Sequence, residues 1–514
     1  MLHVFSPISG EDIAVLNTDE LEETSAETLK EHLAPIVGIT RFRQRLFSED
    51  GSEIGCEDLS LSQKVQLVLL QLVEPNAEQE QQMLNACWGD DAQLLESLLK
   101  EPLDPNVPVR FGNGFEGLYP LHVAATLGSL QCARMLVEAG AEKDSHASNQ
   151  QFTYTALFLA AQGGHIEIVC FLTEAGSDKN ICANNGASPL FIAAQNGHVD
   201  IVRFLTEAGS DKEKANNTGE TPLFIAARQG HIQVVRFLTE AGSDKEKVDG
   251  NGATPLCVAA QNGHFEVVRF LTEAGSDKEK AYPTGHTPLF RAAVYGHIDI
   301  VRFLTEAGSD KDKADEDGAT PLIMAAVQGH IETVRFLTEA GSDKDKAYKG
   351  GATPLILAAH KGHIEIVRFL TEAGSDKDKA DECGATPLFA AAQEGRTQIV
   401  RFLIEAGSDK GKADETGATA LFIAARKGHV DIVRFLTEAG SDKEKANNTG
   451  QTPLFIAARQ GHIQVVRFLT EAGSDKNKSS NTGATPLYIA AQNGHIEVVR
   501  FLTQAGSDKN KSSN

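Results

Sequence analysis

A histidine recurs at one fixed place along most of the chain, and imidazole nitrogens are common ligands of zinc. The copies are His165, His198, His231, His264, His297, His330, His363, His429, His462 and His495. Each stands at least one structural repeat from the next, and packed helices lie about 10 Å apart. Zinc–nitrogen bonds are about 2 Å long, so no two of these side chains can share an ion. We therefore predict a structural role and no metal site, which fits the arginine at the equivalent Arg396.

Other patterns that suggest chemistry are weaker. Gly112 to Gly117 spells GxGxxG, but a dinucleotide site needs a strand before this motif and a helix after it within a βαβ unit. Here the motif lies between two helical pairs, so we expect a hairpin. Serine and threonine recur at capping and turn positions that account for them. The sequence predicts no enzyme, no catalytic residues and no cofactor.

The cysteine pattern and the net charge indicate the cellular compartment and the type of partner. The cysteines are Cys56, Cys87, Cys132, Cys170, Cys182, Cys257 and Cys383, with no CxxC pair. Such scattered thiols are typical of a reducing, intracellular compartment. The net charge of −23 disfavours nucleic acid and favours a basic or neutral partner. No signal peptide or apolar stretch of about 18 residues is evident. We expect the cytoplasm, then the nucleus, and no membrane insertion.

The histidines belong to a sequence unit that repeats every 33 residues. The unit begins at Tyr119, Thr155, Ser188, Thr221, Thr254, Thr287, Thr320, Thr353, Thr386, Thr419, Thr452 and Thr485. The first step is 36 residues long and every later one is 33. Residues 119–514 therefore hold twelve units. Residues 76–118 hold a degenerate thirteenth unit with a polar lead-in, as the end of a stacked array requires.

One unit shows which elements these residues form. Thr221 can cap a helix, Pro222 suits its first turn and Gly230 can end it in a left-handed conformation. Residues 231–240 then form a second helix with one apolar face, and Gly242 ends it before a β-hairpin. Neither helix can bury its apolar face alone, so copies must stack into a solenoid.

Two rows of basic residues follow the same period. Arginines such as Arg203 and Arg302 have a glutamate four residues later, which predicts ion pairs on the helix surface. Lysine pairs such as Lys311 and Lys313 follow each second helix. We interpret the lysines as a solvated face, with a track for an acidic peptide as the alternative.

The repeating motif resembles the ankyrin repeat. Thr-Pro-Leu-x-x-Ala-Ala, Gly-His, Val-Arg-Phe-Leu and Glu-Ala-Gly carry this resemblance over residues 83–514. The family's histidine after Thr-Pro-Leu remains only at His122, and a phenylalanine such as Phe224 replaces it in most units. The resemblance implies a mainly α solenoid of helix-turn-helix and β-hairpin units. It also implies a protein partner bound on the concave face.

Residues 1–75 do not repeat and read as a small α+β domain. Strands are expected at the N-terminus, at Ile13–Leu16, Arg45–Phe47 and Val65–Leu69, and a helix at Ala26–Leu33.

This segment resembles ubiquitin, a β-grasp fold. Gly38-Ile39-Thr40, Arg43 to Phe47, Asp50-Gly51 and Val65 to Leu69 carry the resemblance. The family's apolar recognition patch would fall on Ile8, Phe47 and Val68. A Gly-Gly tail is missing, so conjugation to substrates is not expected. The domain is either a docking module or a structural cap.

The best partner contacts are sought where the repeats differ from one another. The middle units carry Tyr282, Arg291, Tyr295, Tyr348 and His360 at places that are otherwise Asn, Asp, Ile or Gln. Exposed Tyr and Arg are favoured interface anchors, so we predict these five as contacts. Neutral drift is the alternative. The favoured function is a scaffold or adaptor that binds a protein, and the alternative is an adaptor in ubiquitin-linked processes. The sequence leaves the oligomeric state open.

Overall fold

The computed structural model describes residues 2–5, 12–16, 26–37, 39, 41–48, 52–54, 64–110, 116–148 and 153–508. The chain divides into two compact units, Met1–Gly250 and Asn251–Asn514. The first unit holds an α+β module followed by helix pairs, and the second unit holds helix pairs throughout.

The elements of the first unit are β1 (Leu2–Phe5), β2 (Asp12–Leu16), α1 (Ala26–Val37), the 3-10 turn η2 (Arg41–Arg43), β3 (Gln44–Phe47), β4 (Lys64–Leu69), α2 (Ala77–Gly89), α3 (Ala92–Leu99), β5 (Val109–Arg110), β6 (Glu116–Leu118), α4 (Pro120–Leu127), α5 (Leu130–Glu138), β7 (Ala147–Ser148), β8 (Thr153–Tyr154), α6 (Ala156–Gly163), α7 (Ile166–Glu174), α8 (Pro189–Asn196), α9 (Val199–Glu207), α10 (Pro222–Gln229) and α11 (Ile232–Glu240).

The elements of the second unit are α12 (Pro255–Asn262), α13 (Phe265–Glu273), α14 (Pro288–Tyr295), α15 (Ile298–Glu306), α16 (Pro321–Gln328), α17 (Ile331–Glu339), the 3-10 turn η3 (Lys349–Gly351), α18 (Pro354–Lys361), α19 (Ile364–Glu372), α20 (Pro387–Gln393), α21 (Thr397–Glu405), α22 (Ala420–Lys427), α23 (Val430–Glu438), α24 (Pro453–Gln460), α25 (Ile463–Glu471), α26 (Pro486–Gln492) and α27 (Ile496–Gln504).

The N-terminal module is a four-stranded sheet of order β2-β1-β4-β3 with one helix packed on it. The central β1 and β4 are parallel, and the outer pairs are antiparallel. Alternate residues of β3 and β4 point to one face, because side chains in a strand alternate. That face meets α1 in a core of Val4, Ala26, Leu29, Leu33, Leu46, Val65 and Leu67. The predicted strands at β2, β3 and β4 are confirmed, and the predicted helix extends four residues further, to Val37.

The helix pairs follow the local signals of the sequence. The Thr221 hydroxyl accepts the Phe224 N–H at 3.2 Å and caps α10. Gly230 ends that helix at a φ of 80°, in the left-handed region that favours glycine. In α11, Val234, Val235 and Leu238 are fully buried. The predicted helix–turn–helix unit is confirmed.

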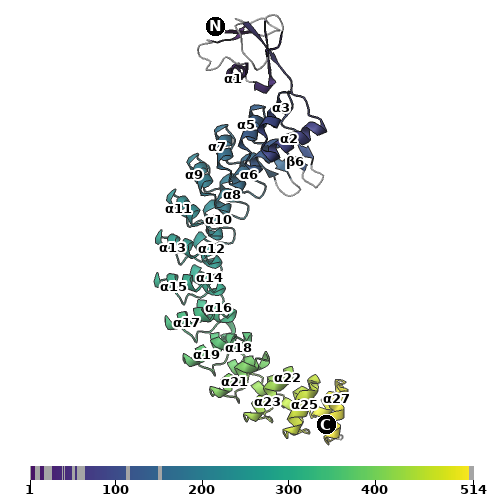
Figure 1. Cartoon of the computed structure of the whole chain (residues 1–514). Helices are drawn as coiled ribbons and strands as arrows, with labels where there is room; N and C mark the ends of the chain where they lie inside the picture. The colour runs from purple at the N-terminus through teal and green to yellow at the C-terminus, as the bar shows by residue number, and fades with distance from the viewer. Residues whose placement is uncertain are drawn as a thin grey trace. The chain divides into compact units, whose positions relative to one another are not determined.

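The pairs stack in two rows within each unit. In the first unit α2, α4, α6, α8 and α10 pack successively, as do α3, α5, α7, α9 and α11. In the second unit the even-numbered helices α12 to α26 form one row and the odd-numbered helices α13 to α27 the other (Figure 1). Each helix therefore buries its apolar face against the neighbouring copies, as a repeat array requires.

The repeated histidines join neighbouring repeats. Nε2 of His297 lies 2.9 Å from the Gln261 carbonyl oxygen, and Nε2 of His330 lies 2.9 Å from that of Val294. The ring also covers the glycine that ends a first helix: a Cβ on Gly296 would stand 2.5 Å from Nδ1 of His330. At the exception, the Arg396 Nε donates to the His360 carbonyl at 3.2 Å. The histidines thus have the structural role that their spacing predicts.

The basic rows also bridge repeats, which the sequence pattern did not indicate. The guanidinium of Arg302 stands 5.0 Å from the ring centroid of Phe336 in the next repeat, and that of Arg335 stands 4.8 Å from Phe369. The Lys313 ammonium donates to the Glu279 carbonyl at 3.0 Å. In these repeats the arginine lies beside the ring of the following repeat and the second lysine of the pair beside a carbonyl of the preceding one, so both rows support the stack.

The hairpins are shorter than expected. Paired strands occur in β5/β6 and β7/β8, whereas the later described hairpins are turns with a single bridge between Ala413 and Thr419. Their tips bond across repeats instead: the Asn448 N–H donates to the Thr416 carbonyl at 2.9 Å. In the second unit such bonds join successive tips from Thr284 to Asn481, so the tips form a continuous edge there. Residues 112–115 of the GxGxxG motif lie outside the described residues, and the flanking β5 and β6 pair as a hairpin.

Candidate functional site

The surface that varies most between repeats is formed by the first helices and the hairpin tips. In the second unit this row of even-numbered helices lies on the inner side of the bend of that unit (Figure 1). Two positions flank the Ala-Ala pair of each first helix in the second unit, a pair that is buried from α12 to α24. The position before the pair, column A, holds Val258, Arg291, Met324, Leu357, Ala390, Ile423, Ile456 and Ile489. The position after the pair, column B, holds Gln261, Val294, Val327, His360, Gln393, Arg426, Arg459 and Gln492.

Three of the predicted contact residues lie together on α14 and the hairpin before it. The Arg291 guanidinium stands 5.3 Å from the ring centroids of both Tyr282 and Tyr295. Its Nη2 also donates to Oε1 of Gln261 at 2.6 Å, and the Tyr282 hydroxyl donates to the same oxygen at 3.3 Å. Tyr295 remains 47% exposed. Cation–π contacts hold these side chains in one arrangement, so the cluster presents a preformed surface.

Tyr348 belongs to a neighbouring apolar strip. Its ring packs against a core of Phe290, Ala319 and Ile323. Four further half-buried side chains from columns A and B cover the same core, and they are Val294, Met324, Val327 and Leu357. Within this apolar strip, Val294 and Val327 occupy column B, where most other repeats carry Gln or Arg. The surface is therefore locally more apolar here.

A pocket of about 450 Å³ follows the strip, between α18, α20 and the hairpin tips. Its lining is Ala352, Ile356, Leu357, His360, Lys361, Asp381, Cys383, Ala385, Phe389, Ala390, Gln393, Asp414 and Arg426. Ala390 explains why the pocket is here. The equivalent Ile423 and Ile456 are 0% and 3% exposed and fill the same place in their repeats. The alanine removes those carbons and leaves a recess of ligand-binding size.

Opposite charges line the two rims of the pocket. The helix rim carries His360, Lys361 and Arg426, and the tip rim carries Asp381 and Asp414. His360 Nε2 lies 3.5 Å from Oε1 of Glu394. The pKa of Glu394 is lowered, mainly by the hydrogen bond that its carboxylate accepts from Gln393 and also by the charge of His360. His360 lies at the pocket, and its role as a partner contact stays a prediction.

Some residues of this surface were not predicted from the sequence. Ala390 attracted no attention because a small residue looks unremarkable in an alanine-rich helix, yet it is the one small residue of column A. In the first unit, Trp88 occupies the column B place of α2 and Leu127 the place in α4 that Tyr295 has in α14, and they are 62% and 42% exposed. Comparison down each column of the repeat, rather than a search for striking residue types, would have found them.

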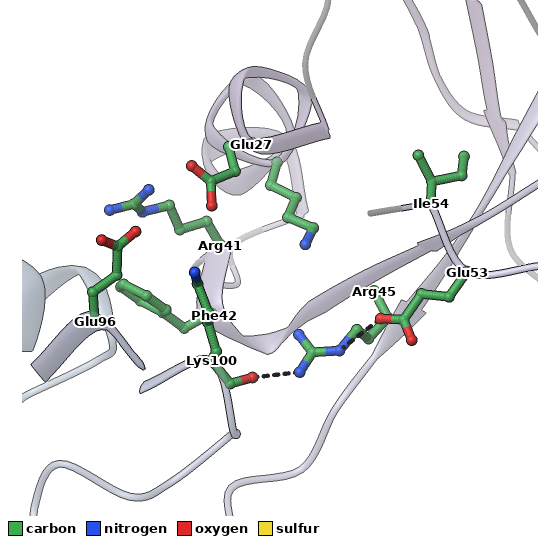
Figure 2. Close-up of a pocket in the computed structure, with 9 residues that line it drawn as sticks. Glu27, Arg41, Phe42, Arg45, Glu53, Ile54, Glu96 and Lys100 are labelled. Carbon is green, nitrogen blue, oxygen red and sulfur yellow. Dashed lines mark hydrogen bonds and ion pairs between the residues drawn. The ribbon is translucent and has the colours of Figure 1, made fainter. Parts of the chain in front are cut away.

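The predicted N-terminal patch is described only in part. Ile8 lies outside the described residues. Phe47 and Val68 share one sheet face with Arg45, because Arg45 pairs with Val68 across β3 and β4. Arg45 forms a 3.0 Å ion pair with Glu53, and it donates to the carbonyl oxygen of Lys100 after α3 (Figure 2).

The N-terminal module is tied to the first helix pairs by further contacts. The Val73 N–H donates to the Pro102 carbonyl and the Asp104 N–H to that of Val73, at 2.8 and 2.9 Å. Arg41 forms a 2.8 Å ion pair with Glu138 of α5. Arg41 and Arg45 also line a pocket of about 280 Å³ with Glu96 and Lys100 (Figure 2). Acidic and basic side chains are mixed in this lining. This favours an interface between the module and the first helix pair over a binding site for one ligand.

Potential reactive groups are held in structural roles. Burial lowers the pKa of His122 to about 4, and its Nε2 lies 3.0 Å from the Ser145 carbonyl oxygen. The thiols of Cys87 and Cys132 share a hydrogen bond that raises the pKa of Cys87 and lowers that of Cys132. Within the described ranges no three His, Cys, Asp or Glu side chains are grouped to hold a metal. Among the described helices, none has both the length and the apolar character to cross a bilayer.

A family model described as "Ankyrin repeats (3 copies)" matches residues 83–183, 175–249, 241–315, 307–381, 373–447 and 439–513. The chain belongs to the ankyrin-repeat family. The matched segments span nearly all of the helical array, including the degenerate pair α2 and α3. The predicted ankyrin fold is thereby confirmed, and the family supports a role in protein interaction rather than catalysis.

Curated relatives match over shorter stretches. Alpha-latrocrustotoxin-Lt1a of Latrodectus tredecimguttatus is 29% identical over 117 residues, 23% of this chain and 8% of the toxin. The nuclear factor NF-kappa-B p105 subunit of Gallus gallus is 34% identical over 108 residues, 21% of this chain and 10% of that protein. Ankyrin repeat and SOCS box protein 3 of Bos taurus is 35% identical over 74 residues, 14% of either chain. This chain thus matches less than a fifth of each of these relatives, and the likeness concerns the ankyrin repeats.

Proposed function

We propose that this ankyrin-repeat protein is a scaffold or adaptor that binds a protein partner on the inner face of its second unit. The observation that carries the proposal is the contrast between a uniform frame and a variable surface. The Ala-Ala pairs of the first helices from α4 to α24 are buried, whereas columns A and B change from Ile and Gln to Arg291, Val294, Met324 and Leu357. Protein interfaces favour aromatic residues, Met and Arg.

The arrangement suits binding with little reorganisation. The Arg291 cluster is already held by its stacking and hydrogen bonds, and the strip beside it lies on rigid helices. A preformed surface loses less conformational entropy on association than a mobile one. The scattered cysteines favour the cytoplasm as the place of this activity, with the nucleus as the second candidate.

A surface exchange tests the proposal. In the full chain, Arg291→Ile, Val294→Gln and Tyr295→Asn together install residues that other repeats carry at these places, such as Ile192, Gln195 and Asn196. We expect the variant to fold normally and to lose proteins that the wild-type chain captures by crosslinking in cells. The matched control, Arg459→Gln, changes a column B residue in α24, away from the Arg291 cluster, and should retain them. Unchanged capture by the triple variant would contradict the proposal.

A second proposal concerns the N-terminal module, which we regard as a ubiquitin-like β-grasp domain that either caps the array or docks a protein. The parallel central pair β1/β4 and the single packed helix α1 support this fold. The contact of Arg45 with Lys100 favours the cap, since Arg45 shares a face with Phe47 and Val68.

The two roles of the module predict different results for Phe47→Ala with Val68→Ala. If the module docks a protein in a ubiquitin-linked process, capture of that protein is lost while the melting temperature changes little. If it is a cap, hydrogen exchange in α2 and α3 accelerates while capture is unchanged. Glu53→Gln, which removes only the charge facing Arg45, is the matched control.

A further inference from the structure

We propose that the pocket beside Ala390 accepts one bulky apolar side chain of a partner segment that also carries Lys or Arg. This deepens the proposed function and depends on it, since it assigns the chemistry of the partner at one place on the inner face.

The shape of the pocket points to a single large side chain. Column A holds Ile, Val, Leu or Met in the other uncharged repeats of the second unit, and only Ala390 is small. The apolar part of the lining includes Ile356, Leu357 and Phe389. A Leu, Met or Phe side chain can replace the missing carbons. Burial of one such side chain corresponds to a gain of about 10- to 100-fold in affinity.

The charges at the pocket favour a basic partner. The two tips beside it are Asp381-Glu382 and Asp414-Glu415, where later repeats carry Asn447-Asn448 and Ser480-Asn481. Oδ1 of Asp381 and of Asp414 accepts backbone N–H groups within each turn, while Glu382 and Glu415 are exposed.

On the opposite rim, Glu394 lies beside His360. The remaining cations Lys361 and Arg426 face two lining carboxylates, Asp381 and Asp414, and the same two tips also carry Glu382 and Glu415. The net charge of −23 adds a long-range attraction for cations. A partner with Lys or Arg next to its apolar anchor therefore matches the pocket better than an acidic one.

The experiment is a selection from a library of displayed random 12-residue peptides on the folded full chain. We expect enriched sequences to combine one Leu, Met or Phe with an adjacent Lys or Arg. Enrichment of acidic apolar peptides would overturn the assigned chemistry, and no enrichment at all would overturn the pocket as a peptide site.

Two variants then test the enriched peptides, and both install residues found in sibling repeats. Ala390→Ile fills the recess, and we expect peptide affinity to fall at least 10-fold. Glu382→Asn with Glu415→Asn removes the exposed charges and keeps the tip-to-tip bonds that Asn448 shows. This variant should weaken binding about 3- to 10-fold and reduce its salt dependence. Ile456→Val, a conservative change at the same position of column A outside the pocket, is the control and should leave affinity unchanged.

An independent measurement uses Cys383, an exposed thiol on the pocket rim. Bound peptide should slow its alkylation by iodoacetamide in the wild-type chain, a readout that holds even if Ala390→Ile fails to fold. Equal alkylation with and without saturating peptide would contradict the pocket.

The outcomes separate this inference from the proposed function. If peptides resist Ala390→Ile but are lost in the Arg291→Ile, Val294→Gln, Tyr295→Asn variant, the inner face binds protein and the pocket inference is wrong. If neither set of changes alters binding, both fail.

Discussion

The second unit contains two stretches with the same frame and different surfaces. From α14 to α20 the inner face carries the Arg291 cluster, the apolar strip with Tyr348, and the Ala390 pocket. From α22 to α26 it carries the common pattern, with Ile423, Ile456 and Ile489 in column A. The buried Leu355 and Leu454 are equivalent in the two stretches, and both are 0% exposed. The fold thus constrains the core positions, and the positions that the core leaves open differ between the two stretches.

The largest expected effect tests whether the buried core positions of the two stretches contribute equally to stability. Leu355→Ala and Leu454→Ala should each lower the local free energy of unfolding by about 3 kcal/mol, because each removes a fully buried side chain and leaves a cavity. Hydrogen exchange of α18 and α24, followed by mass spectrometry, measures both. Losses of stability that differ by more than about 2 kcal/mol would contradict the claim that the two stretches have equivalent cores.

The next largest effect concerns the repeat that keeps a histidine where α14, α20 and α22 have phenylalanine. Burial holds the pKa of His122 at about 4, below the value near 6.5 of the unfolded chain. Between about pH 6.5 and 4 the unfolded chain binds a proton that the folded chain does not, so stability is lost as the pH falls through this window. The loss amounts to about 3 kcal/mol.

The variant His122→Phe should remove this part of the pH dependence. Fluorescence of Trp88, the single tryptophan, reports unfolding from the adjoining α2. An unchanged difference in stability between pH 7 and 4.5 in the variant would show that other groups cause it.

A smaller effect is expected at one buried core position where the repeats differ in polarity. Thr333 in α17 is 1% exposed and its hydroxyl oxygen is buried without a hydrogen-bond partner among the described atoms, whereas the equivalent positions are Ile366 and Val465. Thr333→Val should stabilise the chain by about 1 kcal/mol, and Val465→Thr should cost a similar amount. Thermal melting measures both changes, and a destabilising Thr333→Val would point to a polar role for this hydroxyl.

The smallest expected effect is the stability change of Arg291→Ile, which makes the first stretch more like the second. The contacts of Arg291 with Tyr282 and Tyr295 are partly exposed, so the change should stay below about 1 kcal/mol. Chemical unfolding gives this value. A loss of stability above about 3 kcal/mol would show that the Arg291 cluster mainly stabilises the fold, and would weaken the proposal that it binds a partner.

The sequence predicted the frame well because the frame depends on local signals. Threonine caps, proline at the first turn and glycine at positive φ recur at each period, and stacking follows from the apolar faces. The grouping of Tyr282, Arg291 and Tyr295 could not be read, since residues 9 and 13 positions apart meet only when the hairpin folds onto its helix. The pocket was missed because it arises from the carbons that Ala390 lacks. The role of Ile8 stays a prediction, as it lies outside the described residues.

The central claim is that partner recognition belongs to the first of the two stretches. A photoreactive benzoylphenylalanine at Lys361, and in a separate chain at the equivalent Gln460, tests it in cells that express the full-length protein. We predict that the probe at position 361 crosslinks a protein, that Ala390→Ile suppresses this product, and that the probe at position 460 yields little. Equal crosslinking at both positions, insensitive to Ala390→Ile, would contradict the account.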